Sequence, residues 1–397
     1  MSPQNAVPAS LGDPGLTAML ALFQTGAELT RSDIATCTGW ARVTVTARME
    51  RLLEDGLLEP FAERVNGRGR PATRYRLAAG AGVLLVADVG ATGMRVALCD
   101  LAGNIQATDW RACTIADGPD RVLGIVRRAW KDLMRGSKKI RPWGVAIGLP
   151  GPVEYPRGRV VDPPIMTGWD GFDVSSVISS WYGTVAHVEN DANALAVGEV
   201  AAAAEEGVPI SDLLVVKVGT GVDAGIISGG QVLRGAAGAA GDIGHTEADN
   251  VGGRTNRPVC RCGKVGCVEA YAGGWALVRD AAAEGLDVKD VESFLRLLSA
   301  GDPVARSLTA EAGRVVGSAI TTAVSLLNPE QVLLGGSIGL AGDHLVAAVR
   351  ERVYARSLPL ATRSLRIETS RLRHDAGARG LAHELCRKVL LGAAASA

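Results

Sequence analysis

The chain has 397 residues and no formal net charge, with 42 basic and 42 acidic side chains, and 47% of its residues are hydrophobic. This length predicts two or three domains with a sizeable core, and the ordinary charged fraction excludes a wholly disordered chain. No apolar run is long enough to span a bilayer, and the first residues lack the pattern of a secretion signal. We therefore expect a cytoplasmic protein that does not contact membranes.

Residues 1–80 have the pattern of a winged helix-turn-helix, in which two short helices precede a strand-turn-strand wing. A turn at Gly39 separates the two helices of the motif, and Gly56 ends the second of them. The predicted elements are, in order, helices over 16–23, around 34–35 and over 41–55, then wing strands over 57–64 and 73–77.

This region is predicted to bind DNA. In the second helix of the motif, the side chains that point away from the apolar face are Arg42, Thr44, Thr46 and Arg51. At the wing tip, Arg68 and Arg70 stand on a glycine-rich backbone that suits a narrow minor groove. Two alternatives are a small helical cap with a solvated arginine-rich hairpin, and a module that docks another protein.

The remaining residues, 81–397, alternate strand and helix patterns, which predicts an α/β fold. The apolar or alternating segments that we expect to be strands are 83–88, 95–99, 105–110, 144–147, 185–188, 213–218, 224–227 and 331–334.

Three glycine-rich turns follow predicted strands and are candidates for phosphate binding, because glycine lets backbone N–H groups approach an anion. Each turn alone is weak evidence, since glycine also serves ordinary tight turns. All three in this order have the arrangement of the actin-like sugar kinases. The candidate residues are Asp88, Gly90 and Thr92 in the first turn, Gly219 and Thr220 in the second, and Gly335 and Gly336 in the third.

A carboxylate and an amide lie side by side at Asn190 and Asp191, at the end of a predicted strand. The carboxylate could remove a proton from a sugar hydroxyl while the amide orients another hydroxyl. The alternative is that this pair only caps the following helix.

A cysteine-rich segment carries the most specific signal in the sequence. Cys260, Cys262 and Cys267 lie close together, and His245 precedes them. Three thiolates and one imidazole complete a tetrahedral site, and four protein ligands without an open position indicate structural zinc. The second ring nitrogen of His245 would remain free for a ligand hydroxyl. The alternative is a reduced cysteine-rich loop beside an unrelated histidine.

The sequence resembles the ROK family (repressors, open reading frames, kinases) over essentially its full length. The residues that carry the resemblance are Gly148–Val153, Gly168-Trp169, Asn190-Asp191, Gly244-His245 and the run Cys260–Glu269.

The resemblance implies a two-lobed actin-like fold behind the winged helix. It divides the chain into residues 1–80, a first lobe over 81–192 joined by a C-terminal helix over 375–397, and a second lobe over 193–374. It also implies zinc on His245 and the three cysteines. Sugar would be bound in the cleft by Asn190, Asp191, His245 and Glu269, with Asp242 replacing the family's usual glutamate. In kinase members the residue matching Asp191 is the catalytic base.

Several positions depart from the kinase pattern. Ala91 and Gly93 replace a glycine and a lysine in the first turn, and Asp223 replaces the last glycine of the second, where we expect its carboxylate to repel a triphosphate.

We therefore predict a sugar-responsive regulator, by default a repressor, that binds a pseudo-palindromic operator as a homodimer or homotetramer and senses a sugar or sugar phosphate. The alternative is a sugar kinase that uses ATP and Mg²⁺ and carries a DNA-binding extension.

Overall fold

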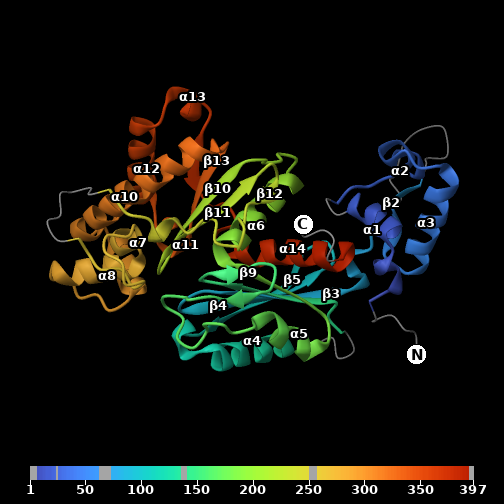
Figure 1. Ribbon diagram of the computed structural model, residues 1–397, viewed down its shortest axis with the longest axis horizontal. Coiled ribbons are helices and arrows are strands. Elements are labelled where there is room, and N and C mark those ends of the chain that lie inside the picture. Colours follow the sequence, from blue (N-terminus) through green and yellow to red (C-terminus); the bar gives the residue numbers. More distant parts are fainter. Residues whose placement is uncertain (1–6, 24–25, 62–72, 136–140, 250–256, 393–397) are drawn as a thin grey trace.

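The computed structural model describes residues 7–23, 26–61, 73–135, 141–249 and 257–392 (Figure 1). An N-terminal region lies at one end of the molecule, and two α/β lobes follow it. Among the described residues, no helix is both long enough and apolar enough to cross a membrane.

The N-terminal region has the elements expected of a winged helix. Its first helix begins two residues earlier than predicted, because Asp13 caps it and Pro14 occupies its first turn. Thr30 and Asp33 form a capping box on the second helix, and Gly39 ends that helix at φ +69°. The elements are α1 (Pro14–Ala21), α2 (Arg31–Thr38), α3 (Arg42–Glu54) and the antiparallel strands β1 (Leu58–Phe61) and β2 (Arg74–Leu77). The wing-tip residues Arg68 and Arg70 lie outside the described residues.

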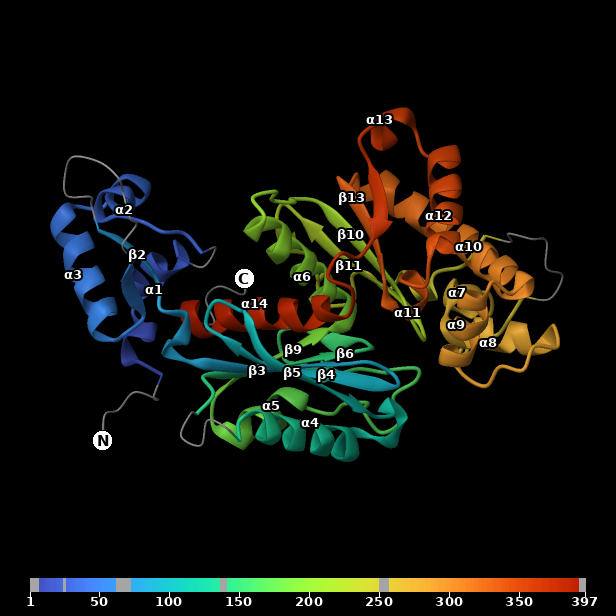
Figure 2. The same cartoon turned by 180° about the vertical axis from the view of Figure 1, so that it is seen from behind.

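The first lobe is built on a five-stranded sheet. In spatial order its strands are β5 (Ile105–Ala112), β4 (Gly93–Asp100), β3 (Val83–Val89), β6 (Gly144–Leu149) and β9 (Val185–Asn190). The β5-β4-β3 pairs are antiparallel, whereas β3-β6 and β6-β9 are parallel. One face packs against α4 (Pro119–Leu133) and α5 (Val174–Tyr182), while the other packs against α14 (Ala376–Leu391) (Figure 2).

The second lobe repeats the strand order and direction of the first. Its strands are, in spatial order, β12 (Gln231–Val232), β11 (Val222–Ser228), β10 (Leu213–Val218), β13 (Gln331–Gly335) and β14 (Arg366–Thr369). One face packs against helices of the main core, which include α7 (Glu269–Ala272), α8 (Gly274–Ala283), α9 (Val291–Ala300), α10 (Pro303–Leu327) and α12 (Asp343–Arg356). The other face packs against α6 (Asp191–Glu205). The smaller elements are the strands β7 (Val153–Glu154) and β8 (Arg159–Val160) and the helices α11 (Gly336–Gly339) and α13 (Pro359–Thr362).

Helices α6 and α14 pack against each other where the lobes meet (Figure 1). Their backbones approach so closely that a Cβ added at Gly198 would lie 2.0 Å from the Ala376 carbonyl oxygen, and one at Gly380 would lie 1.8 Å from the Ala194 carbonyl oxygen. Only glycine permits this approach, so any larger side chain at either position would force the two helices apart.

The N-terminal region shares one hydrophobic core with the first lobe. Met19 and Phe23 of the N-terminal region belong to the same buried cluster as Leu381 and Leu385 of α14. The four side chains are at most 1% exposed. Because burial of this kind fixes the packing of the elements that carry it, α14 connects the winged helix directly to the first sheet.

Candidate functional site

A cavity of about 270 Å³ lies between the two lobes. It is lined by the β3–β4 turn of the first lobe and by the β10–β11 turn of the second, which occupy equivalent places in the two sheets. The structure brings all five predicted sugar-binding residues into its wall: Asn190, Asp191, Asp242, His245 and Glu269. Both polar and apolar groups line a cavity of this size, which suits a small polar ligand.

Asn190 both caps a helix and faces the cavity. It ends β9, and its Oδ1 accepts hydrogen bonds from the N–H groups of Ala192 (2.8 Å) and Asn193 (3.1 Å) at the start of α6. Its Nδ2 donates to a carboxylate oxygen of Asp223 at 2.7 Å. The capping and binding interpretations of this residue are therefore compatible, because the two ends of the amide serve different partners.

Asp223 lines the first cavity, which contains both the predicted sugar-binding residues and residues of two predicted phosphate turns, Thr92 and Gly219 among them. The expectation that Asp223 would face the phosphates of a nucleotide stays a prediction, because the cavity that it lines also contains residues of the two glycine turns. Burial, together with the nearby Asp191 carboxylate, raises the pKa of Asp223 to about 7, although the hydrogen bond from Asn190 opposes that shift. Asp223 is thus a candidate sugar contact that we did not assign from the sequence.

Asp191, the first residue of α6, is 3% exposed and forms an ion pair with Lys217 near the end of β10. Burial raises the pKa of Asp191, and the ammonium group opposes this. The same two residues line a second cavity of about 340 Å³ that adjoins the first.

The predicted phosphate-binding residues are divided between the two cavities. Thr92, Gly219 and Thr220 line the first cavity, and Gly90 lines both. Asp88 and Gly336 line the second, where the further cationic or polar side chains are Arg95, Ser337, Arg373 and His374. Gly335 lines neither of these cavities and packs against Leu195.

The predicted metal ligands come together beside the first cavity. The ligand atoms of His245, Cys260, Cys262 and Cys267 all lie within 4.8 Å of one another, an arrangement that could hold a metal ion. Cys262 Sγ and Cys267 Sγ are 3.7 Å apart, and His245 Nδ1 lies 3.6 Å from Cys260 Sγ. Since Nδ1 faces the thiols, Nε2 is the ring nitrogen left for a ligand in the cavity.

Glu269 lies between this cluster and the cavity and is 7% exposed. One carboxylate oxygen accepts a hydrogen bond from Trp275 Nε1 at 3.2 Å, and the other accepts from the Val222 N–H, also at 3.2 Å. The carboxylate is therefore held by elements on both sides, which fixes the position that it presents to a ligand.

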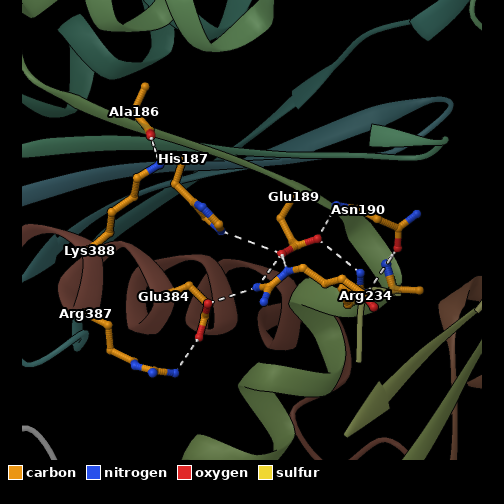
Figure 3. Close-up of polar contacts among 10 residues, drawn as sticks. Ala186, His187, Glu189, Asn190, Arg234, Glu384, Arg387 and Lys388 are labelled. Carbon is orange, nitrogen blue, oxygen red and sulfur yellow. Dashed lines mark hydrogen bonds and ion pairs between the residues drawn. The ribbon is translucent and has the colours of Figure 1, made fainter. Parts of the chain in front are cut away.

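A buried polar network lies directly behind Asn190 and joins the two lobes (Figure 3). Arg234, which follows β12, contacts Glu189 of β9 at 2.7 Å and Glu384 of α14 at 3.0 Å. Glu189 also accepts hydrogen bonds from Asn193 Nδ2 and from the backbone N–H of Asn190. Sequence reasoning missed this network, because its members are isolated charges that are far apart in the chain.

In the winged helix, the predicted DNA-contacting residues differ in their exposure and in whether they pair with another side chain. Arg42 is exposed at the start of α3, and Thr44 and Thr46 are half-buried. Arg51 is exposed but pairs with Asp55 at 3.2 Å. Val43, which we did not select, is 77% exposed on the same helix and could contact a thymine methyl group.

Two lobes of identical strand order, with a cavity between them and glycine turns at equivalent places, define the actin-like sugar-kinase class of fold. The ROK family model matches residues 84–388, and the chain belongs to the ROK family.

Relatives of two kinds are similar to this chain. A xylose repressor from Caldicellulosiruptor bescii is 26% identical, and the match covers 88% of this chain and 89% of the repressor. A glucokinase from Halalkalibacterium halodurans is 30% identical over 74% of this chain and 92% of the kinase. The repressor therefore matches a larger share of this chain than the kinase does.

Solved structures show the same fold. A ROK family transcriptional regulator, a homologue of the E. coli Mlc protein, has a TM-score of 0.78 at 23% identity over 95% of this chain and 97% of its own. A ROK family glucokinase from Streptomyces griseus, in complex with glucose and AMPPNP, has a TM-score of 0.66 at 26% identity. That match covers 77% of this chain and 100% of the glucokinase.

Proposed function

We propose that this chain is a sugar-responsive DNA-binding transcriptional regulator, a repressor of genes for carbohydrate metabolism. Residues 1–80 bind a pseudo-palindromic operator, and two chains of a homodimer or homotetramer present their α3 helices to its two half-sites. The two lobes, 81–192 with the C-terminal helix 375–397 and 193–374, bind the effector. The observation that carries the proposal is the hydrophobic core that the winged helix shares with α14, because it joins the DNA-binding part to the sugar-binding part.

The effector is a small sugar or sugar phosphate held by Asn190, Asp191, Asp242, His245 and Glu269. Its binding favours one arrangement of the lobes, and it can change DNA affinity only by its difference in affinity for the two arrangements. Arg234 supports this coupling, since it reaches from the second lobe to β9 behind the sugar site and to α14. From α14 the change would pass to α1 through the shared core.

Zinc fits the cluster of one histidine and three cysteines. With zinc–sulfur bonds of about 2.3 Å, tetrahedral ligands lie roughly 3.5–4 Å apart, and the observed separations of 3.6 and 3.7 Å are in that range. The ion would use all four protein ligands and so would stabilise the loop beside the cavity without taking part in chemistry.

The test is to purify the full chain, mix it with fragments of genomic DNA at physiological salt, and sequence what it retains. The experiment is run without sugar and with xylose, glucose or N-acetylmannosamine. We expect a shared palindrome that one sugar depletes. Asp191→Asn should retain the DNA and lose the response to sugar, whereas Arg42→Ala should lose the DNA. Retention of DNA without any sequence preference would contradict the proposal.

The second candidate function is an ATP-dependent sugar kinase with a DNA-binding extension, with Mg²⁺ and the glycine turns holding the nucleotide. One observation favours it: the two cavities adjoin at Asp191, the residue that would act as the base. Sugar-dependent ADP release that Asp191→Asn abolishes would establish this activity.

A further inference from the structure

Lys217 occupies the junction of the two interlobe cavities. It is the last residue but one of β10, its side chain lines both cavities, and it forms an ion pair with the buried Asp191 carboxylate. Neither the glycine turn that follows it nor the packing of the β10 strand requires a lysine here. Its ammonium therefore needs an explanation in terms of the groups around it.

Three carboxylates share cavities with this ammonium: Asp191 pairs with it, Asp88 lines the second cavity beside it, and Asp223 lines the first. Burial alone would lower the pKa of Lys217, but Asp191, Asp88 and Asp223 together raise it above its ordinary value. Lys217 in turn opposes the effect of burial on Asp88, whose pKa is raised to about 6. One cation thus interacts favourably with acidic side chains of β3, α6 and β11, the elements that meet at the junction.

A phosphoryl-transfer site needs a divalent cation and a free base where this protein has the Lys217–Asp191 ion pair. Transfer from ATP requires a divalent cation that bridges the phosphates, and carboxylates are the protein ligands which that cation uses. It also requires a base that is free to accept the proton of the sugar hydroxyl. An ammonium that is paired with Asp191 carries one positive charge, offers only donors, and occupies the base.

We infer that Lys217 is a built-in counter-ion that takes, between Asp191 and Asp88, the place of a divalent cation, and so makes the cavity a binding site instead of a phosphoryl-transfer site. This inference rests on the proposed function and explains how a fold shared with kinases serves as a sensor. In this arrangement Asp191 contributes a fixed hydrogen-bond acceptor for a sugar hydroxyl.

The test is Mn²⁺ binding, measured from the electron paramagnetic resonance signal of free Mn²⁺ with zinc-replete, full-length protein. Lys217→Met should gain about one Mn²⁺ site per chain, at least about tenfold tighter than any in the wild type, because two carboxylates lose their counter-ion. Adding Asp88→Asn should abolish the new site. Lys131→Met, which removes an exposed lysine of α4, should bind Mn²⁺ like the wild type.

Unchanged Mn²⁺ binding by Lys217→Met would overturn the inference, as would a gained site that survives Asp88→Asn. Lys217→Gln keeps a long polar side chain and replaces the methionine variant if that variant does not fold. Sugar-dependent ADP release by the wild type would also overturn it. If Lys217→Met gains the Mn²⁺ site but the wild-type protein retains no operator DNA, the inference about Lys217 stands and the proposed regulator function is wrong.

Discussion

Replacement of Arg234 by methionine should weaken the interaction between the two lobes and so lower the stability of the folded protein. The Arg234 side chain is 14% exposed, and the side chains of its partners Glu189 and Glu384 are 4% and 14% exposed, so all three charges are largely removed from water. Two unit charges about 4 Å apart attract by about 4 kcal/mol at an effective dielectric constant of 20. Much of this attraction offsets the cost of burial, but removal of only one partner leaves charges unpaired, and such losses cost about 3–5 kcal/mol.

We therefore expect Arg234→Met to lower the free energy of unfolding by about 3–5 kcal/mol in urea denaturation. Arg296→Met breaks an ion pair whose members are 66% and 84% exposed, and it should cost less than about 1 kcal/mol. Addition of Glu189→Gln and Glu384→Gln to Arg234→Met should recover part of the loss, because it removes the unpaired charges. A loss for Arg234→Met as small as that of the control would refute the argument.

The network also carries a functional expectation: Arg234→Met should weaken the release of operator by sugar more than it weakens sugar binding itself. Fluorescence anisotropy of operator DNA, with and without the sugar that the capture experiment identifies, measures the first quantity. Calorimetry measures the second. Equal losses in both would assign Arg234 to the sugar site rather than to coupling between the lobes.

Three further predictions address other parts of the molecule. Metal analysis of chelator-free protein should find about one zinc per chain, and Cys262→Ser should lose it; a metal-free wild type that folds stably would exclude zinc. Because the pKa of Asp223 is raised to about 7, its carboxyl group becomes charged as the pH rises through that value, and a charged carboxylate accepts stronger hydrogen bonds from hydroxyls. Sugar affinity should therefore increase from pH 6 to pH 8, and Asp223→Asn should flatten the profile; a flat profile in the wild type would count against a sugar contact. Met19→Ala should lower the free energy of unfolding by about 2–5 kcal/mol and reduce the sugar response of operator binding, with sugar affinity unchanged in calorimetry; an unaltered response would show that the shared core does not transmit it.

Local patterns made much of the fold predictable. Most strands of the two sheets have apolar runs. The spacing of Val45, Met49, Leu52 and Leu53 predicts one apolar face for the helix over 41–55, and in α3 the first three are buried and Leu53 is half-buried. The matching strand order of the two lobes was not predictable in this way, because no sequence repeat accompanies it. Nor was the close packing of α6 on α14, since glycines at Gly198 and Gly380 have no local signature that separates a helix crossing from an ordinary small residue.

The candidate site, like the fold, was predictable from the sequence only in part. The cysteine spacing and the Asn190-Asp191 pair indicated which groups to expect, and the structure places them around one cavity. Lys217 and Arg234 were not predicted as site residues, because the role of a single cation depends on the carboxylates that surround it in the folded protein. Those carboxylates come from strands and helices that are distant in sequence, so only the tertiary structure could bring them into view.

The core shared by α1 and α14 has a consequence for how the protein is made. Helix α1 ends at Ala21, whereas α14 begins at Ala376, so a growing chain exposes the part of α1 that packs on α14 until almost all of the described residues have left the ribosome. Contacts between such distant segments form slowly, and their absence leaves hydrophobic surface open to aggregation. A chain that terminates prematurely before Ala376 would therefore present a poorly packed winged helix, and incomplete copies would compete weakly for the operator.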